Sequence, residues 1–166
     1  MPETLATLPS PRQVLSRVTV AAEPLRPLSP HHEIERVQAV ADLQEEHGFT
    51  ACERTPVAAE LLHVEIEPGR LTFDLRRLDG ESVGAHVLAM GPFRAAIREY
   101  NLIVDSHEAA VMTGSAERVQ AIDMGRRGLH DAGAGLLTAR LAGKIAVDRA
   151  AARRLFTLMC VLQRRD

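Results

Sequence analysis

Two neighbouring stretches in the middle of the chain, residues 61–67 and 70–76, alternate between apolar and other side chains. A period of two residues is typical of a β-strand with one buried face. A Pro-Gly turn sequence at 68–69 separates the two stretches. In the register that this turn favours, three apolar pairs face each other: Leu62 with Leu75, Val64 with Phe73, and Ile66 with Leu71. The sequence therefore predicts a β-hairpin with one apolar face, which the rest of the chain must cover.

A third strand is expected at residues 83–90, after the turn sequence Asp79-Gly80. A two-residue turn places one set of residues on the apolar face: Gly84, His86 and Leu88. A three-residue turn with a glycine bulge places the other set there, because a shift of one residue reverses the strand: Val83, Ala85 and Val87. The second set is more apolar, so the sequence favours it.

The C-terminal half is expected to be mainly helical. Apolar residues recur every three to four positions from Gly91-Pro92 to about Thr113. Ser115 and Asp148 are typical N-cap residues for two further helices. The last of these contains residues 155–162, which are apolar almost all round and should lie in the core. A buried strand is the alternative for that stretch.

The N-terminal half has weaker patterns. We expect a short strand from Arg12 to Val20, a helix that begins at Ser29-Pro30, and irregular structure over residues 50–59. Three prolines in residues 1–11 indicate a flexible leader. The prediction is therefore a leader followed by a single α+β domain, residues 12–166, in which a small antiparallel β-meander packs against a mainly C-terminal set of helices.

Composition limits the possible functions of the 166 residues. The net charge is −2, so no overall field attracts nucleic acid or anionic lipid, and the low aromatic content of 3% argues against stacking on single-stranded bases. Cys52 and Cys160 lie far apart and suit a reducing compartment. Neither a secretory signal nor an apolar stretch of membrane-spanning length is present, so we expect a cytoplasmic protein with no membrane partner.

The segment Ala121–His130 is the most unusual part of the predicted helices. It contains Gly125 and Gly128, although each interior glycine costs a helix about 0.5–1 kcal/mol relative to alanine. Helical spacing places these glycines in one stripe of small residues: Gly125, Gly128, Ala132 and Gly135. The first interpretation is a surface that admits a closely packed neighbouring helix.

Arg126 falls on the stripe of this helix that should face the core, between apolar residues: Val119, Ile122, Leu129 and Gly133. Asp123 is spaced to pair with Arg126 or with Arg127, which gives a purely structural role. The functional alternative is anion binding, in which Arg126 and Arg127 hold a phosphate or carboxylate and His130 is a further donor. A third reading is general acid/base chemistry by His130 with Asp123 or Asp131.

Other candidate sites are weaker. Arg153 and Arg154 stand near the start of the last helix, where helix polarity does not favour cations, so they pair with acids or with an external anion. His31 and His32 are adjacent and diverge around a helix, and His63 and His86 converge under only one register of the third strand. We therefore expect no metal site and no cofactor.

Several segments together resemble the UPF0262 family of bacterial proteins. They are residues 121–130, Leu141 to Asp148, Ala152 to Leu162, and the shorter Gly91-Pro92-Phe93-Arg94 and His86-Val87-Leu88. The family's first helix often reads Glu-His-Glu-Arg, whereas this chain has Ile34 in the second of those positions, so a histidine role is not expected there. The resemblance implies a small cytosolic bacterial protein and brings no activity, cofactor or catalytic residue with it.

The predicted function is a non-enzymatic binding or adaptor module. Its arginine patch, made of Arg126, Arg127, Arg153 and Arg154 with His130, would recognise an anionic group on a protein, nucleotide or RNA partner. The alternative is a small enzyme that uses His130, Asp123 and the arginines on a phosphate- or carboxylate-bearing small molecule. The sequence leaves the oligomeric state open.

Overall fold

The computed structural model describes residues 14–46 and 48–164. The predicted leader, residues 1–11, lies outside the described residues, and so do Arg12, Gln13, His47, Arg165 and Asp166. The division of the chain into a leader and one domain stays a prediction.

A mixed four-stranded sheet has the order β1-β3-β4-β5, with these bounds: β1 (Arg17–Ala21), β3 (Leu61–Ile66), β4 (Arg70–Arg76) and β5 (Ser82–Ala89). The hairpin β3–β4 has the predicted register, with Val64 opposite Phe73 and Ile66 opposite Leu71. Strand β1 pairs with β3 in parallel, which the sequence did not indicate. A parallel neighbour requires a crossover connection, and the helix α1 (Pro30–Glu45) lies in it.

The favoured register of the third meander strand is wrong. The turn does contain three residues, since Arg77 N–H donates to the Glu81 carbonyl at 2.8 Å and Gly80 has a φ of +90°. However, Val83 is an additional bulged residue, because Arg76 pairs with Ser82 and Leu75 pairs with Gly84. The turn shifts the register by one residue, and the bulge shifts it by one residue in the opposite direction, so the two shifts cancel. His86 and Leu88 therefore share the face of Phe73, and Val87 is 53% exposed.

A second, two-stranded sheet is formed by β2 (Phe49–Ala51) and β6 (Ile145–Val147), which pair antiparallel. The prediction of irregular structure from residue 50 is therefore wrong at its first two positions. Strands of three residues are too short to show an alternation, so only their pairing, across almost a hundred residues of chain, reveals them.

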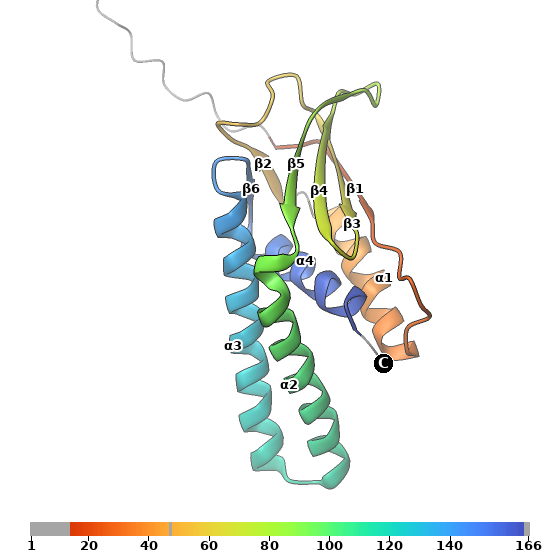
Figure 1. Cartoon of the computed structure of the whole chain (residues 1–166), viewed down its shortest axis with the longest axis vertical. Helices are drawn as coiled ribbons and strands as arrows, with labels where there is room; N and C mark the ends of the chain where they lie inside the picture. The colour runs from red at the N-terminus through yellow and green to blue at the C-terminus, as the bar shows by residue number, and fades with distance from the viewer. Residues whose placement is uncertain (1–13, 47, 165–166) are drawn as a thin grey trace, which may run out of the picture.

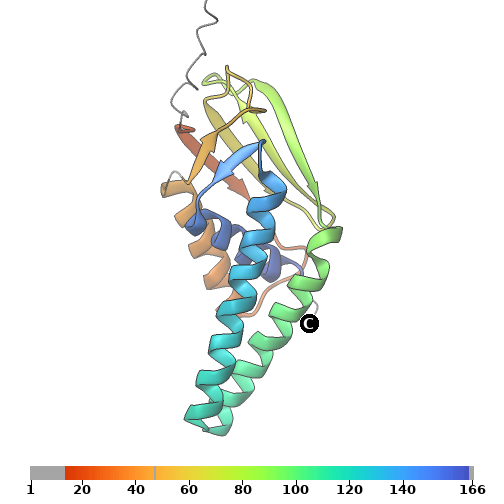
Figure 2. The same cartoon turned by 90° about the vertical axis from the view of Figure 1, so that its left-hand side faces the viewer.

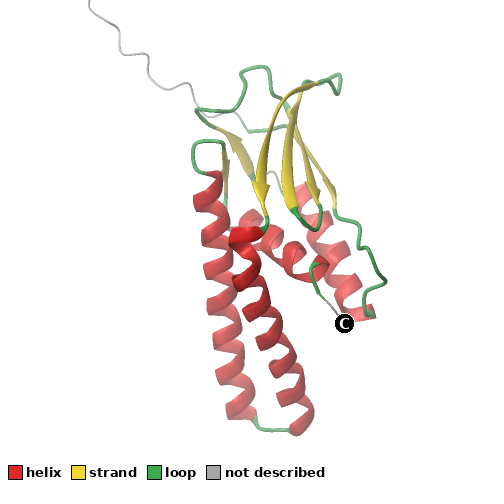
Figure 3. Cartoon of the chain, in the orientation of Figure 1, coloured by secondary structure: helices red, strands yellow, loops and turns green. Residues whose placement is uncertain are grey.

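The remaining elements are the short helix η1 (Gly91–Phe93) and the helices α2 (Arg94–Thr113), α3 (Ala116–Leu141) and α4 (Arg149–Leu162). The predicted N-caps are confirmed, since Ser29, Ser115 and Asp148 each accept a hydrogen bond from a backbone N–H of the first helical turn. Helices α2 and α3 lie side by side and extend away from the sheet (Figures 1 and 2). The fold is α+β, with helices mostly in the C-terminal half (Figure 3).

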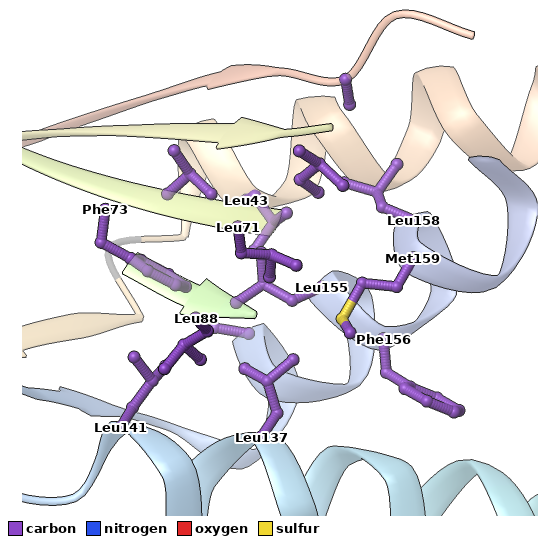
Figure 4. Close-up of a cluster of buried hydrophobic side chains, with 14 of the residues drawn as sticks. Leu43, Leu71, Phe73, Leu88, Leu137, Leu141, Leu155, Phe156, Leu158 and Met159 are labelled. Carbon is purple, nitrogen blue, oxygen red and sulfur yellow. The ribbon is translucent and has the colours of Figure 1, made fainter. Parts of the chain in front are cut away.

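Helix α4 is the centre of the core, as its sequence predicts. Eight of its residues are buried: Ala151, Ala152, Leu155, Phe156, Leu158, Met159, Cys160 and Val161. Leu155 and Met159 meet the apolar face of the sheet, represented by Leu71 and Leu88, on one side and Leu137 of α3 on the other (Figure 4). Among the described residues, no helix has the length and apolar character that crossing a membrane requires.

The glycines of α3 do not act as the sequence suggested. A Cβ added at Gly128 or Gly135 would meet nothing within 4 Å, so no helix packs there. Gly125 does face α2, since its Cβ would lie 2.8 Å from Cδ1 of Ile103. The tightest position is Gly133, outside the predicted stripe, where an added methyl group would overlap the ring of Phe156. Helix α4 therefore packs closely on α3 at one glycine, Gly133, and not along a stripe of glycines.

We expect Gly133→Ala to lower the free energy of unfolding by about 1–3 kcal/mol, because the new methyl group forces Phe156 out of its position in the core. Gly128→Ala, on the same helix and in open space, should raise it by about 0.5–1 kcal/mol through better helix propensity. Urea unfolding followed by circular dichroism measures both. Equal effects of the two substitutions would contradict this account of α3.

Candidate functional site

Arg126 is neutralised within its own helix. Its Nε and Nη2 atoms donate to Oδ1 of Asp123 at 3.1 and 2.8 Å. The other carboxylate oxygen of Asp123 pairs with Nε of Arg127 at 3.0 Å. The hydrogen bond from Arg126 holds the pKa of Asp123 below its ordinary value, so the carboxylate is charged at neutral pH. The structural role of Arg126 therefore accounts for a charged residue on the core-facing stripe.

Three of the predicted site residues meet elsewhere, in a hollow of about 500 Å³ between α3 and α4. We call it the arginine hollow and define it by its lining residues: His130, Arg149, Ala150, Arg153, Arg154 and Thr157. Arg126 and Arg127 do not line it, so the predicted patch of four arginines is divided between two places. Another hollow, of about 590 Å³ at the α2–α3 turn, is lined by Asp123 but by no arginine.

Sequence reasoning missed Arg149. It directly follows the N-cap residue Asp148 and stands four positions before Arg153, so helical spacing places both arginines on one face of the first turns of α4. That spacing was the available signal. It carried little weight because arginines near a helix N-terminus are usually exposed and unfavourable with respect to helix polarity.

Acidic residues compensate the arginines of the hollow unequally. Arg154 pairs with Asp42 of α1 at 3.1 Å and with Glu46, the C-cap residue of that helix, and thereby ties α4 to α1. Arg149 and Arg153 share a single carboxylate, that of Asp131, through longer pairs of 3.3 and 3.5 Å. Arg149 and Arg153 thus have two positive charges against the one carboxylate that they pair with, while the carboxylate of Asp148 caps the start of the same helix.

The first turn of α4 adds hydrogen-bond donors to this charge. The Asp148 side chain caps the N–H of Ala151 at 2.7 Å. Among the hydrogen bonds of the described residues, none uses the backbone N–H of Arg149 or Ala150. Free amides at a helix N-terminus attract anions, since they are donors at the positive end of the helix dipole. The hollow thus lies beside the N-terminal turn of α4, which contributes Arg149 and Ala150 to its lining.

His130 lies at the inner side of the hollow and is only 7% exposed. Its Nε2 atom is 2.7 Å from Oγ1 of Thr157, whose hydroxyl donates to the Arg153 carbonyl at 3.1 Å. Because that hydroxyl hydrogen is already used, Thr157 accepts a hydrogen bond and Nε2 of His130 carries the proton. The Nδ1 atom is buried and has no hydrogen-bond partner among the described residues. His130 therefore donates its one N–H to Thr157 and has no donor left for a ligand, unlike its predicted role.

His130 is neutral at pH 7. Burial, and then the nearby charge of Arg153, lowers its pKa to about 4. Its ring packs against those of Tyr100 and Phe156, with centroids 5.3 and 5.6 Å apart. Asp123, the proposed catalytic partner, bonds to Arg126 and Arg127 instead. Asp131, the other proposed partner, pairs with Arg149 and Arg153. A base with a pKa of about 4 is poorly matched to proton transfer at neutral pH.

The other histidines that the structure describes form no common site. His63 faces away from the core and bonds to Thr19 at 2.7 Å, whereas His86 lies on the opposite face of the sheet. His32 is buried at the start of α1, where its Nδ1 atom is 2.6 Å from Oγ of Ser29. Within the described part of the chain, no three histidine, cysteine or acidic residues are grouped so that they would hold a metal ion.

We expect the free energy of unfolding to fall as the pH is lowered from about 6.5 to 4. Unfolded His130 takes up a proton near its ordinary pKa of 6.5, whereas the folded ring does so only near pH 4, so acid favours the unfolded chain. The loss attributable to His130 should be about 3 kcal/mol. Burial lowers the pKa of His32 and His86 as well, which adds a smaller change of the same sign.

Chemical unfolding at a series of pH values measures this effect. His130→Gln keeps a donor for Thr157 but cannot titrate, so its stability should depend much less on pH over this range. His31→Gln, at an exposed position, is the matched control and should behave like the wild type. An unchanged pH dependence in His130→Gln would show that the buried ring is not responsible.

Comparison with known proteins places this chain in a family. The model of UPF0262, described as an uncharacterised protein family, matches residues 12–165. A UPF0262 protein of Granulibacter bethesdensis is 50% identical over 159 residues, 91% of this chain and 90% of the relative. One of Acidiphilium cryptum is 51% identical over 138 residues, covering 83% and 85% of the two chains. No solved structure matches. The chain therefore belongs to the UPF0262 family.

Proposed function

We propose that this protein is a cytoplasmic, non-enzymatic binding module that recognises an anionic group on a protein, nucleotide or RNA partner. The arginine hollow is the proposed site, with Arg149 and Arg153 as the principal ligand-binding residues. The observation that carries the proposal is the meeting of Arg149 and Arg153 in one hollow, where they share the single carboxylate of Asp131.

The chemistry of these groups favours an oxyanion. Guanidinium groups donate parallel hydrogen bonds that match the oxygen atoms of a carboxylate or phosphate. Helix N-termini bind the same groups through their amides, so the two kinds of donor select one class of ligand. Arg154 has a supporting role, since its two acidic partners on α1 leave it little charge for a ligand. Arg126 and Arg127 are not part of the proposed site, because they share Asp123 away from the hollow.

Binding is better supported than catalysis. The competing proposal, an enzyme built on His130 and Asp123, requires these residues to act together, but each has a different partner. His130 contributes a neutral ring and gives its one N–H to Thr157. We place the module in the cytoplasm because Cys52 and Cys160 are both free, which suits a reducing compartment.

A titration with sulfate, at ionic strength held constant with sodium chloride, tests the proposal. Nuclear magnetic resonance of the backbone amides should show saturable shifts centred on Arg149, Ala150 and Thr157. The double variant Arg149→Gln/Arg153→Gln should bind sulfate at least about tenfold more weakly, since it loses two charge-assisted partners. Arg126→Gln/Arg127→Gln is the matched control, with the same loss of charge outside the hollow, and should bind like the wild type.

Two results would reject this site. The first is a wild-type protein without saturable shifts. The second is loss of binding in Arg126→Gln/Arg127→Gln together with unchanged binding in Arg149→Gln/Arg153→Gln. Circular dichroism of each variant checks that it is folded, because Arg153 pairs with an acid of α3.

A further inference from the structure

The carboxylate of Asp131 already occupies the place that an anionic ligand would take. Its Oδ2 atom lies 3.3 Å from Nη2 of Arg149, and its Oδ1 atom lies 3.5 Å from Nη1 of Arg153. One carboxylate thus bridges both arginines through its two oxygen atoms, as a bound oxyanion would. An external anion must therefore displace Asp131 from these arginines or bind to them together with Asp131.

Asp131 holds the arginines loosely. Charge-assisted hydrogen bonds from a guanidinium to a carboxylate are usually about 2.7–2.9 Å long, and both pairs here are longer. The Asp131 side chain is 40% exposed as a whole, but its Oδ1 atom is buried and accepts no hydrogen bond from the described residues, so the carboxylate gains contact with water when it turns away from the arginines. Exposed ion pairs of this kind contribute little to stability. The free energy needed to displace Asp131 from the arginines is therefore small.

The exchange discriminates between anions. An external carboxylate, or any other monoanion, replaces the single charge of Asp131 with another single charge and gains little. A phosphate monoester carries close to two negative charges at neutral pH and has three free oxygen atoms. Its oxygen atoms can accept hydrogen bonds from both arginines at once, and its second charge exceeds the single charge of the Asp131 carboxylate that it replaces. A phosphodiester, as in an RNA backbone, carries only one charge.

We infer that the ligand of the arginine hollow is a phosphate monoester dianion, and that Asp131 is the internal carboxylate that such a ligand must displace from the two arginines. The inference rests on the proposed function, because it assumes that anions bind in the hollow. It narrows the partner to a phosphorylated protein or a nucleotide with a terminal phosphate, and it argues against the internal phosphates of RNA.

Binding of three small probes at pH 7.5 and constant ionic strength tests the inference: methyl phosphate, dimethyl phosphate and acetate. The wild type should bind methyl phosphate at least about tenfold more tightly than either monoanion. Asp131→Asn removes the competing charge with little change of shape, so it should bind all three probes about three- to fivefold more tightly. Asp123→Asn is the matched control, because Asp123 also bridges two arginines of α3 but lies outside the hollow.

The outcomes separate the inference from the proposed function. Equal binding of dimethyl phosphate and methyl phosphate by the wild type would overturn the dianion selectivity and leave anion binding intact. Unchanged or weaker binding by Asp131→Asn, or an equal gain in Asp123→Asn, would overturn the role of Asp131. Absence of binding by every probe to both the wild type and Asp131→Asn would reject the site itself. If the inference holds, tighter binding of phosphoserine or of adenosine monophosphate than of methyl phosphate identifies the carrier of the phosphate.

Discussion

The packing of Phe156 on Gly133 is the contact on which both the core and the arginine hollow depend. The ring lies where a side chain on α3 would otherwise be, so α3 and α4 approach closely at this point. On α4, Thr157 directly follows Phe156, and Arg153 stands three positions before Phe156. On α3, His130 stands three positions before Gly133. The close approach therefore brings Thr157 within 2.7 Å of His130 and places Arg153 beside the carboxylate of Asp131. A larger residue at position 133 would separate the two helices and the groups of the hollow together.

The sequence pattern was sufficient to predict those elements that depend on interactions between residues close together in the chain. The β3–β4 hairpin followed from its alternation, and the three helix N-caps from single residues with a known local hydrogen bond. The register of β5 did not follow, because the bulge at Val83 undoes the shift made by the turn and has no sequence signal of its own. The pairings β1–β3 and β2–β6 join distant segments, so they depend on how the helices assemble.

The candidate site was predictable only in part, for a similar reason. The inward position of Arg126 and its pairing with Asp123 both follow from helical spacing, and both are present. Spacing within one helix cannot tell which face of α4 meets α3. Arg153 and Arg154 are adjacent in sequence, yet one turns to Asp131 on α3 and the other to Asp42 on α1. The predicted patch of four arginines was therefore divided by packing, and Arg149 took the place of Arg126 and Arg127.

The burial of His130 has a consequence for the charge of the hollow. A histidine with its ordinary pKa would change charge near neutral pH and would alter the attraction for an anion. Enclosure by Tyr100, Phe156 and Thr157 lowers the pKa to about 4, so the ring stays neutral over the range in which a phosphate monoester becomes a dianion. The arginines and the carboxylates of Asp131 and Asp148 then determine the charge that a ligand meets. The burial of His130 that lowers stability in acid thus keeps the charge of the hollow constant near neutral pH. Any pH dependence of binding in that range then reports the ionisation of the ligand.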